Sequence, residues 1–241
     1  MAMEMIEHAG RKASSVCIHA DLYQGTDEWM AARCGMLTAS EMSLIVTPTL
    51  KAARNEKEKA HLYELLAQRI SGYVEPRYVS DDMLRGQDDE VEALTLYAKH
   101  FAPTEAVGFI TNDKWGFTLG YSPDGLVGRD GLVEVKSRRQ KFQIETFVVH
   151  VIDGTIPADF AIQIQTGLLV SERAWCDLVS YSGGLPLAVI RAYPDPAVQD
   201  AIITAAGDFE KRLTAALARY RDAVAKAGSI QTERLVREII L

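Results

Sequence analysis

The hydrophobic period changes about midway along the chain, and this change limits the fold more than any other feature of the sequence. Before it, apolar residues recur three or four apart, which predicts helices over residues 62–70 and 81–100. After it come three short runs typical of strands, at residues 107–111, 115–119 and 132–136. Helices and strands mixed in one chain predict an α/β or α+β fold, with a central mixed β-sheet flanked by helices.

The second half adds further elements to this sheet. Helices are expected over residues 142–152 and 157–170. Strands are expected at 175–181 and 187–193, and Gly183-Gly184 between them predicts an antiparallel hairpin. A terminal helix is expected over 195–226, where apolar residues again recur three or four apart. The length of 241 residues fits a single domain, residues 1–241.

Three segments of the first half carry weaker local signals. Residues 1–20 are expected to form a loose N-terminal leader, and the polar residues 49–59 to form a mobile loop. Residues Thr38 to Glu41 match a capping box, S/T-x-x-E, which predicts the start of a helix.

Composition limits the partners and the compartment. The net charge is -7, which argues against a protein that binds nucleic acid through its overall charge, so any DNA contact must come from a local basic surface. Three scattered cysteines predict neither a disulfide framework nor a zinc site and fit a reducing cytoplasm. No run of the sequence is apolar for long enough to be a signal peptide or a membrane span.

The chemistry is concentrated in Ser122-Pro-Asp124-Gly and in the strand around Glu134-Val135-Lys136. Alternate residues of a strand share a face, so Glu134 and Lys136 point one way while Val135 points to the other. A turn-rich return brings Asp124 beside Glu134. Two close carboxylates repel each other unless a cation lies between them, and Mg²⁺ prefers oxygen ligands. This pattern favours a metal-dependent phosphodiesterase; the alternative is a solvated strand face with an ordinary Glu and Lys.

Several motifs together resemble the phage lambda exonuclease, or YqaJ-like viral recombinase, family of the PD-(D/E)xK nuclease superfamily. They occur in the family's order over residues 26–181. They are Arg33-Cys-Gly-Met-Leu-Thr-Ala-Ser40-Glu, Gly86-Gln-Asp-Asp-Glu90, Ser122-Pro-Asp124-Gly, Glu134-Val135-Lys136 and Gln163-Ile-Gln165. The resemblance implies a restriction-endonuclease-like core.

The resemblance also assigns roles to individual residues. Asp124 and Glu134, with the Val135 carbonyl and Glu90, would hold Mg²⁺, with Mn²⁺ as the alternative and two ions per site. Lys136 would position the attacking water, supported by Gln163. Residues expected to contact DNA or its terminal phosphate are Arg33, Ser40, Arg138, Arg139, Lys141, Lys51 and Arg54.

The implied activity is that of a double-strand DNA 5′-to-3′ exonuclease of phage or prophage recombination. It would release mononucleotides and leave a 3′ single-strand tail. The implied partners are DNA ends, two further copies of the chain in a homotrimeric ring, and a single-strand annealing protein, in the cytoplasm of a bacterial host. Two alternatives remain open. One is an endonuclease or junction resolvase of the same superfamily, and the other is a non-catalytic module that binds DNA ends.

Overall fold

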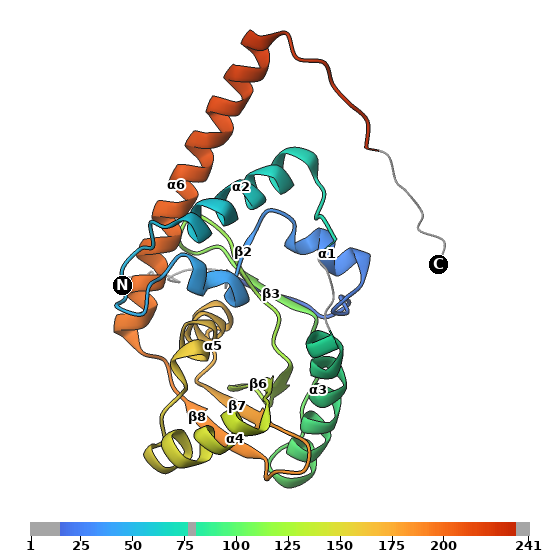
Figure 1. Cartoon of the computed structure of the whole chain (residues 1–241), viewed down its shortest axis with the longest axis vertical. Helices are drawn as coiled ribbons and strands as arrows, with labels where there is room; N and C mark the ends of the chain where they lie inside the picture. The colour runs from blue at the N-terminus through green and yellow to red at the C-terminus, as the bar shows by residue number, and fades with distance from the viewer. Residues whose placement is uncertain (1–14, 77–80, 235–241) are drawn as a thin grey trace, which may run out of the picture.

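The computed structural model describes residues 15–76 and 81–234, and it has the mixed α/β architecture that the sequence predicts (Figure 1). The α-helices are α1 (Asp27–Arg33), α2 (Glu56–Ser71), α3 (Asp81–His100), α4 (Gln140–Glu145), α5 (Ala158–Ser171) and α6 (Pro196–Ala227). Two short segments complete them, the 3₁₀ helix η1 (Ala39–Leu44) and the π-helical η2 (Thr146–Val151).

The strands form two four-stranded sheets, so the expectation of one central sheet is corrected. The first sheet has the order β1-β3-β4-β2, and its strands are β1 (Val16–His19), β3 (Phe109–Asn112), β4 (Leu119–Tyr121) and β2 (Leu37–Thr38). The second has the order β5-β6-β7-β8, with β5 (Gly125–Val127), β6 (Gly131–Ser137), β7 (Trp175–Tyr181) and β8 (Ala188–Ala192). Each sheet contains one parallel pair, β2 with β4 and β6 with β7.

Helix α5 lies at the centre of the molecule and joins the two sheets (Figure 1). It contacts β3 and β4 of the first sheet and β7 of the second, and most of its residues are buried. The main core therefore contains residues from both sheets, such as Ile110 and Leu178. A smaller core lies under α3, where Ala93 and Tyr97 pack on Val133, Val135 and Val179.

Helix α6 packs on α2 and α5 through its first half, with Phe209 and Leu213 fully buried. Its second half extends beyond the body of the molecule (Figure 1). The bounds Pro196–Ala227 agree with the predicted terminal helix to within one residue at each end. No helix in the described ranges is long and apolar enough to cross a membrane.

The strand predicted at residues 115–119 is wrong, because residues 114–117 form a turn and the strand is Leu119–Tyr121. The Asn112 side-chain oxygen accepts a hydrogen bond from the Lys114 backbone N–H at 3.2 Å, which turns the chain. Gly116 then adopts a φ of 80°, a conformation that favours glycine. Trp115 and Phe117, on either side of Gly116, are residue types that favour strands, but they do not form one here.

The N-terminal expectations also need correction. Residues 16–19 of the predicted leader form β1, which pairs with β3. The predicted loop 49–59 ends early, because α2 begins at Glu56, capped by the Asn55 side chain. The capping box does not form either: the Thr38 hydroxyl donates to the Glu41 carboxylate at 3.1 Å, and a 3₁₀ helix follows in place of an α-helix. The helix predicted over 142–152 begins as α4 and widens into η2.

Hydrogen bonds to a buried carboxylate fix α3 to the second sheet. Asp177 of β7 is 2% exposed and accepts two hydrogen bonds from the Arg191 guanidinium, at 2.7 and 2.8 Å. The Tyr97 hydroxyl of α3 donates to the same carboxylate at 2.6 Å. Since hydrogen bonds to a charged group stabilise more than neutral ones, this contact holds α3 against β7.

The Tyr97→Phe variant tests the strength of this contact. We expect it to lower the free energy of unfolding by about 1.5–3 kcal/mol, because a buried carboxylate loses a hydrogen-bond donor. Chemical denaturation measures the loss. Tyr220→Phe, at a half-exposed tyrosine of α6, is the matched control and is expected to stay close to the wild type. Equal stability of both variants would contradict the role of Tyr97.

Candidate active site

Strand β6 places the predicted acidic and basic residues on one face, as alternation requires. Val133 and Val135 are buried against α3 in the smaller core. Glu134 and Lys136 point to the other face, where the Lys136 ammonium lies 2.7 Å from Glu134 Oε1. Glu134 is only 2% exposed, so this is an enclosed ion pair and not the solvated strand face of the alternative interpretation.

The antiparallel pairing of β5 with β6 brings Asp124 to the same place. Gly125 lies opposite Val133, so the residue just before β5 reaches the middle of β6. Asp124 Oδ2 accepts a hydrogen bond from the Val135 backbone N–H at 2.6 Å. The turn-rich return between Asp124 and Glu134 therefore has the effect that the sequence predicted.

The central helix and the first sheet complete the surroundings of Glu134. Gln163 of α5 accepts a hydrogen bond from Lys136 at 3.1 Å through its side-chain oxygen, and its amide nitrogen donates to Glu134 Oε1. The Tyr121 hydroxyl of β4 donates to the other carboxylate oxygen, Oε2, at 2.8 Å. Gly167 leaves the room for this ring, since a Cβ there would lie 2.7 Å from it.

The carboxylates are crowded enough to change their protonation. Burial raises the pKa of Asp124 well above its usual range, and the charges of Glu134 and Glu90 raise it further. The pKa of Glu90, on α3, is raised by burial and then by Glu134. Burial alone would lower the pKa of Lys136, but the surrounding carboxylates outweigh it and raise that pKa. Lys136 therefore stays protonated at neutral pH.

The donor set fits a divalent cation. Three carboxylates, of Asp124, Glu134 and Glu90, influence one another's charge, and one ammonium cannot neutralise them all. Hard oxygen donors of this kind suit Mg²⁺ or Mn²⁺. The Val135 residue, whose carbonyl is the further predicted ligand, lines the same cavity as Glu90 and Lys136.

A cavity of about 670 Å³ lies over this cluster and has a basic wall. Lys136 shares its lining with Arg85, Arg138 and Arg139. The Arg138 guanidinium lies between the rings of Phe142 and Phe160, at 4.9 and 5.0 Å from their centroids. Its buried Nε has no hydrogen-bond partner among the residues that the structure describes. The two rings thus hold the Arg138 guanidinium at the wall of the cavity.

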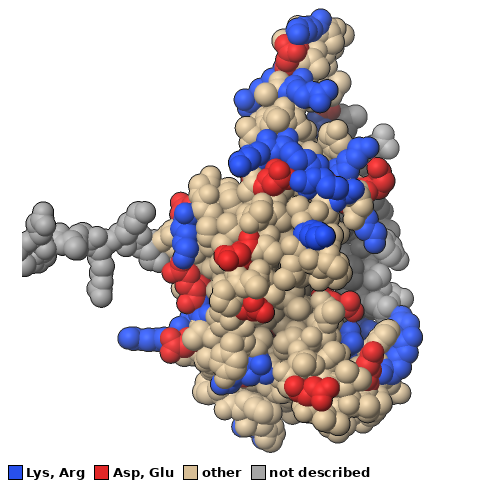
Figure 2. Space-filling view, turned by 90° about the vertical axis from the view of Figure 1, so that its left-hand side faces the viewer, with Lys and Arg blue, Asp and Glu red and all other residues tan. Residues whose placement is uncertain are grey.

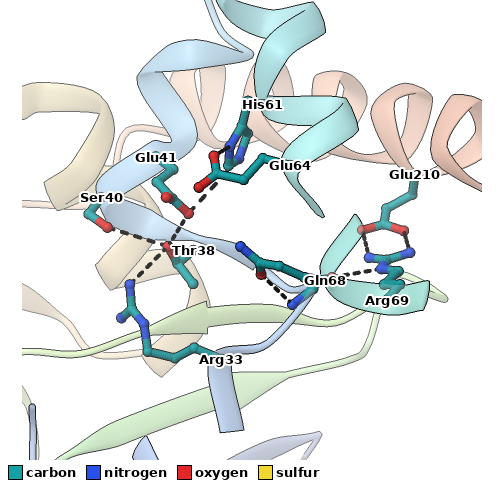
Figure 3. A network of polar contacts seen from close by, with 10 residues as sticks. Arg33, Thr38, Ser40, Glu41, His61, Glu64, Gln68, Arg69 and Glu210 are labelled. Atoms are coloured by element: carbon teal, nitrogen blue, oxygen red, sulfur yellow. Dashed lines mark hydrogen bonds and ion pairs between the residues drawn. The ribbon is translucent and has the colours of Figure 1, made fainter. Parts of the chain in front are cut away.

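A second cavity of about 630 Å³ adjoins the first, because Gln87 and Glu90 of α3 line both. Arg33 lines it from α1, stacked 4.2 Å over the Trp29 ring, and donates to the Ser122 hydroxyl at 3.1 Å. The second guanidinium nitrogen of Arg33 lies 3.4 Å from the Thr38 hydroxyl, which in turn contacts Ser40 at 3.3 Å (Figure 3). The structure thus brings Arg33 and Ser40 together.

The other predicted basic contacts lie elsewhere. Arg54 forms an ion pair with Asp208 of α6, and neither Lys51 nor Arg54 lines the two cavities. Figure 2, which views the side of the molecule that α6 occupies, shows Lys and Arg side chains gathered over the upper part of this face, with Asp and Glu between them. Lys141 is exposed on α4, with its ammonium 4.6 Å from the Phe142 ring centroid.

Two residues of the site were not predicted from the sequence. Tyr121 has the character of an ordinary strand residue in the sequence, and only the tertiary arrangement of the two sheets brings its hydroxyl to Glu134. Gln87 lies within the Gly86–Glu90 motif, but nothing in its type distinguishes it from its neighbours. Gln87 lies one helical turn before Glu90, so both side chains share one face of α3. This spacing is the clue in the sequence that Gln87 belongs to the site.

The chain is similar to known proteins along most of its length. Residues 28–174 match the model of the YqaJ-like viral recombinase domain. The structure of an alkaline exonuclease, LHK-Exo, from Laribacter hongkongensis is similar at 30% identity and a TM-score of 0.73 over 84% of this chain and 100% of that one. Its complex with dAMP is similar at 31% identity and a TM-score of 0.74, with the same coverage. No curated protein matches the chain.

A more distant structure supports the fold alone. It is a phage-related exonuclease from Haemophilus somnus 129PT, at 13% identity and a TM-score of 0.50 over 76% of this chain and 96% of that one. At this identity the likeness shows that the arrangement of helices and sheets is shared, and it carries nothing about individual residues.

Removal of one carboxylate is expected to change how stability depends on pH. In the folded, metal-free protein the pKa of Asp124 is raised. The free energy of unfolding therefore falls as the pH rises from the ordinary carboxyl range through that raised pKa. Asp124→Asn keeps an oxygen to accept the Val135 N–H and removes the charge. We expect the melting temperature of the variant to exceed that of the wild type at neutral pH and to converge with it in acid. Asp153→Asn, at an exposed carboxylate, is the control, and a constant difference across pH would contradict the argument.

The Tyr121→Phe variant tests whether the hydroxyl orients Glu134. Loss of a hydrogen bond to a metal-ligating carboxylate typically lowers metal affinity about 10–100-fold. We expect a rise of this size in the dissociation constant for Mg²⁺, measured by calorimetry, with little change in the rate at saturating Mg²⁺. Tyr23→Phe, at an exposed tyrosine, is the control. An unchanged Mg²⁺ affinity would show that Tyr121 serves packing alone.

Proposed function

Because the chain belongs to the YqaJ-like viral recombinase family and resembles an alkaline exonuclease along most of its length, we propose that it is a Mg²⁺-dependent exonuclease of double-stranded DNA. It digests one strand from the 5′ end, releases mononucleotides and leaves a 3′ single-strand tail. The observation that carries this proposal is the convergence of Asp124, Glu134 and Lys136 at the middle of β6, beside a basic cavity that Lys136 and Glu90 line.

Each residue of the cluster has a task in phosphodiester hydrolysis. Asp124, Glu134 and Glu90, with the Val135 carbonyl, hold the metal, for which we propose two ions. When bound, Mg²⁺ stabilises the negative charge that develops on the entering and leaving oxygens. Lys136 keeps its proton, so it orients the attacking water and offsets negative charge and does not act as a base. Gln163 fixes the Lys136 ammonium and the Glu134 carboxylate relative to each other.

The two adjoining cavities suit a DNA end. The scissile phosphate lies over the carboxylates, with Arg138 and Arg139 against neighbouring phosphates. The terminal 5′ phosphate lies in the second cavity, where Arg33 binds it; Ser40 lies beside the wall of this cavity, in contact with the Thr38 hydroxyl, and assists. Charge-assisted hydrogen bonds from guanidinium groups to phosphate are strong and directional. Lys51, Arg54 and Lys141 contact DNA only outside these cavities, in a salt-dependent way.

The surface around α4 and η2 supports assembly with further copies of the chain. Six apolar side chains there are at least one-third exposed, namely Phe142, Ile144, Val148, Val149, Val151 and Ile152. Many exposed apolar side chains on one short segment favour a protein interface. We propose a homotrimeric ring around DNA, working with a single-strand annealing protein in phage or prophage recombination.

A strand-specific time course tests direction and chemistry together. The substrate is a linear duplex with a 5′ phosphate and an end label on one strand. We expect Mg²⁺-dependent loss of nucleotides from the phosphorylated 5′ end, while the complementary strand stays full length. Lys136→Ala is expected to reduce the rate at least 100-fold, as is typical for loss of a group that stabilises transition-state charge. Undiminished activity of this variant would reject the role of Lys136.

Covalently closed circular DNA separates the proposal from its alternatives. An exonuclease leaves the circle intact and degrades it once it is linearised. Cleavage of the closed circle would identify an endonuclease or junction resolvase. Tight binding of linear ends without any cleavage in Mg²⁺ or Mn²⁺ would identify a non-catalytic end-binding module.

A further inference from the structure

A buried histidine next to the second cavity is held by a carboxylate on one side of its ring. His61 lies on α2, its side chain is 1% exposed, and its ring packs 5.8 Å from that of Phe209. Its Nδ1 lies 3.2 Å from Glu64 Oε2 (Figure 3). A carboxylate accepts hydrogen bonds and donates none when ionised, so Nδ1 carries the proton that it shares with Glu64.

The opposite side of the ring lacks a complementary partner. His61 Nε2 is buried and has no hydrogen-bond partner in the described part of the chain. It faces Glu41 Oε2 at 3.9 Å, a distance too long for a hydrogen bond. With Nδ1 protonated, the neutral imidazole presents a lone pair to a carboxylate, and two such groups attract each other only through a cation between them.

From this arrangement we infer a second metal site, in which His61 Nε2 and the Glu41 carboxylate bind a divalent transition-metal ion of the Zn²⁺ type. Zinc binds His nitrogen and carboxylate oxygen at about 2.0–2.2 Å, so an ion between two donors 3.9 Å apart reaches both with little movement. Mixed nitrogen and oxygen donors favour such an ion over Mg²⁺. Glu41, His61 and Glu64 place their donor atoms within 4.8 Å of one another.

Glu64 has a supporting task in this site. A histidine that binds metal usually donates its other ring N–H to a carboxylate, which fixes the tautomer and orients the ring. Glu64 stands in this position relative to Nδ1. Glu64 thus supports the His61 imidazole, and the metal lies between that imidazole and the Glu41 carboxylate. Helix α2 contributes Glu64 and His61, and η1 contributes Glu41.

The site is separate from the Asp124–Glu134 cluster and opens on the second cavity. Glu41 lines that cavity, and its Oε2 also accepts the Thr38 hydroxyl at 3.1 Å. The ion's remaining coordination positions are filled by water or by an anionic oxygen from the cavity side. A simpler arrangement has a proton in place of the metal, so that His61 is an imidazolium between two carboxylates. The experiment must distinguish this arrangement from metal binding.

The experiment uses the full chain with the catalytic metal ligands removed. The Asp124→Asn, Glu134→Gln double variant, stripped with chelator, is titrated with Zn²⁺ by calorimetry and with Co²⁺ as a visible-absorbance probe. We expect one ion per chain. Adding His61→Gln or Glu41→Gln is expected to abolish that binding, and adding Glu64→Gln to weaken it about 10–100-fold. Adding Glu56→Gln, at an exposed residue of the same helix, leaves it unchanged.

Three results would overturn the inference. They are no ion bound by the double variant, binding that survives both His61→Gln and Glu41→Gln, and binding lost equally in the Glu56→Gln control. Circular dichroism checks that each variant folds. If the His61→Gln variant does not fold, the Glu41→Gln variant decides the question. Since the double variant lacks nuclease activity by design, the outcome is independent of whether the proposed DNA substrate is correct.

Discussion

Repulsion among close carboxylates is the constraint on which the site depends. Asp124, Glu134 and Glu90 come from a loop, a strand and a helix, and each raises the cost of ionising another. The protein offsets part of this cost with hydrogen-bond donors from its scaffold. Asp124 receives the Val135 backbone N–H, and Glu134 receives the hydroxyl of Tyr121 and the amide of Gln163. What remains uncompensated is negative charge that a divalent cation can use.

The fold is arranged so that these donors reach the carboxylates. The chain leaves the first sheet at Tyr121 and enters the second at Gly125, so three residues separate a donor to Glu134 from the sheet that bears Glu134. Helix α5 runs between the sheets and brings Gln163 to the same point. Helix α3 is fixed from the other side through Tyr97 and Asp177. Displacement of any one of these elements changes the electrostatics of the whole site.

Local patterns in the sequence predicted the groups that alternation or periodicity determines. The order Val133-Glu134-Val135-Lys136 required a buried face and a polar face, and the structure has both. Patterns failed where a side-chain contact or tertiary packing determines the local backbone structure. Trp115 and Phe117 have strand-like character, but the Asn112 side chain and the positive φ of Gly116 turn the chain there. The Thr38 hydroxyl donates to the Glu41 carboxylate and does not cap a backbone N–H of the following turn. In the first case the turn residues Asn112 and Gly116 were outweighed in the prediction by the aromatic residues beside Gly116. In the second, neither residue type nor spacing indicates which partner the Thr38 hydroxyl finds.

One helix forms part of both cavities, since Gln87 and Glu90 face each of them. If the function is as proposed, the cavity for the DNA end and the cavity for the scissile phosphate share a wall that is a helix and not a loop. Under the proposed function, the length of the fragment removed would then depend on the position of α3 and not on the base sequence of the DNA.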